Sequence, residues 1–109
     1  MVLCASSAYE KKFYLNENFE GLPQHVKDEL KMCVLFTEDV GGVLSLEFDE
    51  NGNLELNTSA DEGDLLYDEI GSVLKIKQMQ QEKQELFESL ETYYKVFFLG
   101  EDIEDDNGD

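Results

Sequence analysis

The chain has 109 residues, of which 26 are acidic, eight are lysine and none is arginine, giving a formal net charge of −18. Binding to DNA, RNA or an anionic membrane depends on clustered cations, so this composition argues against all three as partners. Apolar residues make up 41% of the chain, which is enough for the core of one small domain. Residues 1–101 are therefore expected to form a single domain.

The N-terminal third predicts a short strand followed by a helix. The strand is the aromatic-rich segment Lys11–Asn16 (KKFYLN). The helix lies within Gly21–Gly42, because Pro23 suits a first turn, where no N–H is left unpaired, and Gly41 with Gly42 suits a helix end. One turn of this helix is apolar nearly all round, so we expect a sheet to cover one side and another helix or chain to cover the other.

The clearest local pattern predicts a β-hairpin. In Val43–Ser59 (VLSLEFDENGNLELNTS), leucine and phenylalanine alternate with polar residues on both sides of an Asn-Gly pair. Asn and Gly tolerate the positive φ angles of a tight hairpin turn. The hairpin should have one apolar face, which must lie on the helices because an isolated two-stranded hairpin is only marginally stable.

A long helix is predicted at the C-terminal end. Ser59, Asp61 and Asp64 are alternative N-caps for it. An unbroken helix over Asp64–Leu99 has 36 residues, and its length is roughly 54 Å. A compact domain of this size has a diameter of about 30 to 35 Å. Gly71-Ser72 is the position where a kink is least costly.

Apolar residues in this helix recur at steps of three and four, the spacing of paired helices. We consider two ways to cover them. Either a second copy of the chain packs on the helix, giving a two-fold homodimer, or a kink at Gly71-Ser72 folds the last half back onto the domain. The candidate dimer interface consists of Ile76, Met79, Leu86, Phe87, Leu90, Tyr93, Tyr94 and Phe97.

No catalytic, cofactor-binding or metal-binding residues are predicted. His25, the sole histidine, should be an exposed helix residue, and Cys33 a small buried hydrophobic residue. Cys4 is expected to be more exposed and distant from Cys33, which argues against a tetrahedral zinc site. The acidic runs DENGNLE and DIEDDNGD place their glycines at the wrong positions for an EF-hand loop. Binding of divalent cations to the acidic segment is left open.

The charge is concentrated in one segment, and it guides the functional prediction. Glu38–Glu69 contains eleven acids and no cation, and we expect it to form an acidic face. The two cysteines are too few for a disulfide framework, and no signal segment or membrane span is evident, so a cytoplasmic location is predicted. We predict a non-enzymatic interaction module that acts as a homodimer.

Two alternative functions remain open at this point. The first is a nucleic-acid mimic or inhibitor whose carboxylates bind a basic protein. The second is a small-ligand binder that uses the C-terminal aromatic cluster as a pocket.

Much of the chain resembles a known family. The runs CVLFTEDVGGVLSLEF and LLYDEIGSVLKIKQMQQEKQELFESLETYYKVFFLGE, with the opening MVLCAS, are similar to a family of small acidic bacterial proteins known only as a domain of unknown function. The resemblance implies a bacterial cytosolic protein and implies no reaction and no site residues.

Together these patterns predict an α+β fold. The expected order is a short N-terminal strand, a helix, a β-hairpin and a long C-terminal helix, followed by a disordered acidic tail at residues 102–109.

Overall fold

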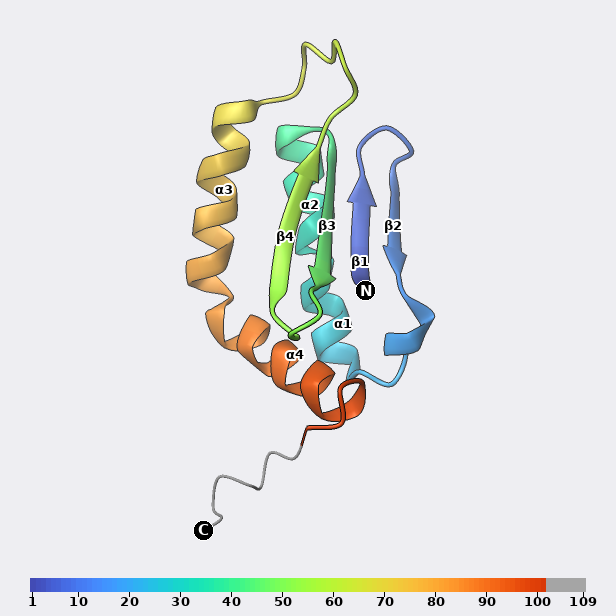
Figure 1. Ribbon diagram of the computed structural model, residues 1–109. Helices are drawn as coiled ribbons and strands as arrows, with labels where there is room; N and C mark the ends of the chain where they lie inside the picture. The colour runs from blue at the N-terminus through green and yellow to red at the C-terminus, as the bar shows by residue number, and fades with distance from the viewer. Residues whose placement is uncertain (102–109) are drawn as a thin grey trace.

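The computed structural model describes residues 1–101 (Figure 1). The predicted tail, residues 102–109, lies outside the described residues. The elements, in chain order, are β1 (Val2–Ser7), β2 (Lys12–Leu15), the 3₁₀ helix η1 (Glu17–Phe19), α1 (Gln24–Leu30), α2 (Met32–Val40), β3 (Val43–Phe48), β4 (Leu54–Ser59), α3 (Glu69–Glu82) and α4 (Gln84–Phe97).

The strands form one antiparallel sheet in the order β2-β1-β3-β4 (Figure 1). Alternate residues of β3, Leu44, Leu46 and Phe48, are buried on the face that carries the helices. Their neighbours Ser45 and Glu47 lie on the other face, because successive side chains of a strand point to opposite sides. The predicted α+β class is confirmed, as are the hairpin and the strand within Lys11–Asn16.

Strand β1 was not predicted, although it lies in the middle of the sheet between β2 and β3. Its register with β3 shifts between Val2 and Cys4, and both Leu3 and Cys4 are buried. The irregularity removes the alternation by which a half-buried strand is recognised from sequence.

The helix predicted within Gly21–Gly42 is two helices. They meet at Lys31, where the N–H of Val34 donates to the Lys31 carbonyl, a bond that spans three residues instead of four. This tighter turn separates α1 from α2. The ends of the predicted segment are nevertheless close to those observed, with Pro23 directly before α1 and Gly41 directly after α2.

The prediction of an unbroken C-terminal helix is wrong, and so is the position predicted for a kink. The helix breaks at Lys83, between α3 and α4, each of which has 14 residues. Gly71 and Ser72 lie in the first turns of α3, whose N-cap is Asp68 and not Ser59, Asp61 or Asp64. The Asp68 side chain accepts a hydrogen bond from the Gly71 N–H at 2.9 Å, so this glycine belongs to a regular helix start.

The end of α4 is held by stacked aromatic rings. Phe19 of η1 is fully buried between Phe48 of β3 and Phe98, with ring centroids 5.7 and 4.9 Å away. Tyr94 stacks on Phe48 at 4.3 Å. Because these contacts lie at one end of the sheet, α4 turns away from the line of α3 and crosses that end (Figure 1).

Candidate functional site

The histidine and the two cysteines, whose side chains often act as bases or nucleophiles, do not form a catalytic arrangement with one another. His25 is exposed on α1, as predicted. Cys33 is buried, also as predicted, but the expectation for Cys4 is wrong: it is fully buried in β1. A hydrogen bond with the Cys33 side chain, together with burial, raises the pKa of the Cys4 thiol, so Cys4 is protonated and unreactive at neutral pH. The two cysteines are therefore neighbours in the core.

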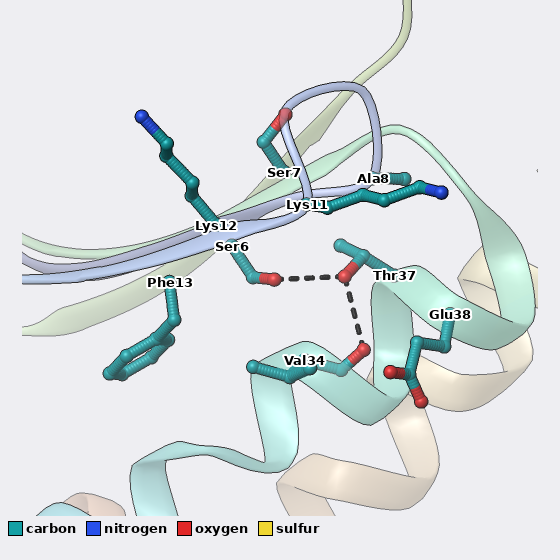
Figure 2. A pocket seen from close by; sticks show the side chains of 9 residues that line it. All are labelled: Ser6, Ser7, Ala8, Lys11, Lys12, Phe13, Val34, Thr37 and Glu38. Carbon is teal, nitrogen blue, oxygen red and sulfur yellow. Dashed lines mark hydrogen bonds between the residues drawn. The ribbon is translucent and has the colours of Figure 1, made fainter.

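A cavity of about 590 Å³ lies between the β1–β2 turn and α2 (Figure 2). Ser6 and Thr37 are buried there and share a hydrogen bond of 2.8 Å, and Thr37 also donates to the Val34 carbonyl at 3.1 Å. A hydroxyl becomes a nucleophile only when a base takes its proton, and these partners are a hydroxyl and a carbonyl. The pair ties β1 to α2 and has no partner that would activate it.

Two lysines border this cavity. Lys12 is adjacent to Phe13 in β2, so its side chain leaves the sheet on the opposite side from the Phe13 ring and the Ser6–Thr37 pair (Figure 2). Glu38 also lines the cavity, and its negative charge offsets the positive charge of Lys11. The lining of the cavity thus carries no concentrated charge.

The predicted dimer interface is largely occupied by the chain itself. Phe87, Leu90 and Tyr94 are core residues. Four others are half-buried and pack against the core, and these are Ile76, Met79, Leu86 and Tyr93. Phe97 alone of the set is mainly exposed, at 70%. The physical reason is that Phe48 of β3 and Phe19 of η1 cover the inner face of α4. A second copy of the chain was one of the two covers predicted for this face.

Exposed aliphatic side chains gather elsewhere, at the beginning of α3. Their exposed fractions run from 56% for Val73 to 94% for Leu65. We call this surface the α3 patch, and it consists of Leu65, Leu66, Ile70, Val73 and Leu74. With a 100° step per residue, Ile70 and Leu74 lie opposite the buried Ser72, while Val73 lies on one flank. The apolar spacing of these residues can be read in the sequence, but their exposure is known only from the structure.

The segment that carries Leu65 and Leu66 is anchored by hydrogen bonds before and after the two leucines. The Tyr9 hydroxyl donates to Asp64 at 2.6 Å and accepts from the Asp61 N–H at 2.8 Å. The Tyr67 hydroxyl donates to Ser72 at 2.9 Å. The two leucines are therefore held in solvent by a fixed loop, and ordering them for a partner costs little conformational entropy.

Acidic side chains border this patch. Asp61, Glu62, Asp64 and Glu69 belong to the same loop and helix start. The Tyr9 hydroxyl and the Leu66 N–H lower the pKa of Asp64, so it stays ionised. The acids of Glu38–Glu69 do not form one continuous face. Glu47 and Glu55 are neighbours in the β3–β4 register and lie on the open face of the sheet, away from the helices. The acidic surface beside α3 is one part of that segment.

Within residues 1–101, no group of three or more histidine, cysteine or acidic side chains is arranged to hold a metal ion. None of the helices described here combines the length and hydrophobicity needed to cross a bilayer.

Comparison with known proteins identifies the family. A family model described as a family of unknown function (DUF6145) matches residues 1–102, and the chain belongs to this family. The resemblance seen in the sequence is thereby confirmed at the level of a family without assigned function. Neither the curated proteins nor the solved structures contain a match.

Proposed function

We propose that this chain is a non-enzymatic, cytoplasmic interaction module that binds another protein through the α3 patch. The observation that supports the proposal is the exposure of five aliphatic side chains on a loop and helix that are themselves well anchored. Contiguous apolar surface on a folded protein typically marks a contact site for another molecule. The two unpaired cysteines agree with a reducing compartment such as the cytoplasm.

Self-association is the second candidate function. The observation that favours it is Phe97, which remains 70% exposed on α4 next to half-exposed Leu99. A homodimer could cover these residues together with the outer face of α4. The acidic border of the α3 patch, in contrast, disfavours pairing of two identical patches, because like charges would face each other across the interface.

Site-specific photo-cross-linking tests the proposed surface. A photoreactive phenylalanine analogue is placed at Leu66 in the protein expressed in its native cells, which are then irradiated. We expect a discrete covalent adduct, because a bound partner holds apolar atoms against this position. The same analogue at Tyr14, which is 53% exposed on the open face of the sheet, is the matched control.

The mass of the adduct separates the two candidates. An adduct at Leu66 whose mass exceeds the chain by that of another protein supports a heterologous partner. An adduct of twice the chain mass, formed by the same analogue placed at Phe97 instead, supports self-association through the outer face of α4. Labelling at Leu66 that is no stronger than labelling at Tyr14 contradicts the α3 patch as a binding surface.

A further inference from the structure

The outer edge of β4 is free over most of its length. The Asn53 carbonyl accepts a hydrogen bond from the Asp49 N–H within the hairpin. The N–H of the next residue, Leu54, points away from β3 and donates to the Glu91 carboxylate of α4 at 2.8 Å. Backbone groups of successive residues in a strand point to opposite sides, so those of Leu56 and Thr58 also point away from β3. Among residues 1–101, no hydrogen bond reaches either of these two amides.

A groove lies at the C-terminal end of this edge. It has a volume of about 670 Å³ and lies between the end of β4 and the start of α3. Tyr67 and Val73 line it from the helix side, and Thr58 lines it from the strand side. The groove joins the α3 patch, since Leu65 and Val73 belong to both.

The two edges of the sheet differ in how they are protected against pairing. β2 has four residues and carries Lys12, and short strands with lysine resist the addition of another strand. β4 has six residues in regular register with β3, without proline, lysine or a bulge. An edge of this kind favours pairing with a further strand.

The charge around the groove determines what kind of strand fits. Its lining includes Asp61, Glu62, Asp64 and Glu69 and no lysine. A second copy of this chain would bring the same acids against each other, and residues 102–109 are themselves acidic. A segment with lysine or arginine would instead place opposite charges together.

We infer that β4 accepts an extended, basic segment of a partner protein as a fifth strand, with alternate apolar side chains in the groove between β4 and α3. This inference rests on the proposed function and specifies the chemistry of its partner. Main-chain hydrogen bonds to Leu56 and Thr58 provide pairing, while Leu65 and Val73 contact the apolar side chains. Lysine or arginine residues of the segment lie beside the acids that line the groove.

Fluorescent eight-residue peptides of alternating valine and lysine are the probe. Binding to the full chain is measured by fluorescence anisotropy at low and high salt. We expect saturable binding that weakens as salt rises, because screening reduces the attraction between the lysines and the acids. A valine–glutamate peptide of the same length is the control for charge and should not bind.

The strand-pairing geometry is tested from both partners. N-methylation of every second peptide amide should abolish binding when the methyl groups face β4 and should be tolerated on the alternate amides. Thr58→Pro removes an outward N–H without touching the ladder to β3, and proline is tolerated at such edge positions. Loss of one hydrogen bond of about 1.4 kcal/mol corresponds to about tenfold weaker binding. Thr58→Ala, which keeps the N–H, should bind like the parent chain.

Three results would overturn the inference. They are equal binding of the lysine and glutamate peptides, equal loss from both N-methylated series, and unchanged affinity of a Thr58→Pro variant whose circular dichroism matches the parent. If peptides fail but the Leu66 adduct persists, the fifth-strand inference is wrong while the α3 patch stands. Absence of both peptide binding and the adduct contradicts the proposed function itself.

Discussion

Helix α4 and the beginning of α3 are both rich in large apolar residues, yet only α4 is covered by its own chain. Phe87, Leu90 and Tyr94 of α4 are buried, while Ile70 and Leu74 of α3 stay in solvent. Spacing along a helix therefore predicts an apolar face and leaves open what covers that face. In this protein the inner face of α4 is covered within the fold, and the apolar residues at the start of α3 are not.

The difference follows from where each helix is attached. α4 lies against Phe19 and Phe48, whose rings fill the end of the sheet. The start of α3 is attached along one flank to α2, through the Lys75–Asp39 ion pair and the bond from the Asp68 N–H to the Val40 carbonyl. These attachments orient Ile70 and Leu74 outward.

The largest expected effect comes from deleting the ring at the centre of the covered region. Phe48→Ala removes a buried ring that contacts Phe19 and Tyr94, and Phe-to-Ala changes in a core typically cost about 3 to 5 kcal/mol. The free energy of unfolding, measured with urea and circular dichroism, should fall by this amount. Ile70→Ala in the exposed region is the control and should change stability by less than about 0.5 kcal/mol. Equal losses for both variants would show that α3 is covered in solution.

The next largest effect on stability is expected at Gly42, where the start of β3 meets Tyr67 of the loop before α3. Gly42 has φ +70°, and an added Cβ would lie 2.5 Å from the Ser59 carbonyl oxygen and 2.8 Å from the Tyr67 ring. Gly42→Ala should therefore lower the free energy of unfolding by more than about 2 kcal/mol. Gly63 has φ +83° with no atom near its missing Cβ. Gly63→Ala should cost about 1 kcal/mol, from backbone strain alone. A smaller loss at Gly42 than at Gly63 would contradict the packing of Tyr67 on this turn.

A smaller effect is expected from the tyrosine that anchors the loop. Tyr9→Phe removes the donor to Asp64 and the acceptor for the Asp61 N–H, so amide hydrogen exchange at Asp61 should accelerate without global unfolding. The interaction also depends on pH. Because the folded pKa of Asp64 is lowered, its stabilisation is present above the unfolded pKa and is lost as pH falls through the folded value.

The phenol of the same pair has the opposite dependence. The hydrogen bond to Asp64 raises the pKa of Tyr9, so its contribution is complete below the unfolded pKa and is lost as pH rises through the folded value. If the protection of the Asp61 amide against exchange does not change with pH and is the same in Tyr9→Phe as in the parent chain, this loop has another anchor.

The last prediction concerns the reactivity of the two cysteines and not the stability of the fold. Iodoacetamide should alkylate Cys4 and Cys33 very slowly in the native protein and rapidly in denaturant, because both thiols are buried and the pKa of Cys4 is raised. Thr92→Cys on the exposed side of α4 supplies a matched reporter that should react at the rate of a free thiol. Mass spectrometry counts the added groups. Rapid alkylation of Cys4 in the native state would contradict a central position for β1.

Local chemistry determined several features of this protein in advance. The Asn-Gly pair and the alternation on both sides of it gave the β3–β4 hairpin, since its turn depends only on neighbouring residues: Gly52 has φ +88°, and Asp49 accepts from the Asn51 and Asn53 N–H groups. Pro23 and Gly41 likewise located the ends of the α1–α2 segment, because both act on the backbone beside them. The net charge of −18 follows from composition alone, and it argues against nucleic acid as a partner.

Only the tertiary structure decided where the long helix breaks and which apolar residues face solvent. Lys83 is neither glycine nor proline, so its backbone carries no intrinsic signal for a break. The chain bends there because α3 packs on α2 while the rings of α4 pack on Phe48, two contacts far apart in sequence. The free edge of β4 arises in the same way, since strand order is set by the pairing of β1 with β3. Such long-range contacts depend on the whole core, and no single segment encodes them.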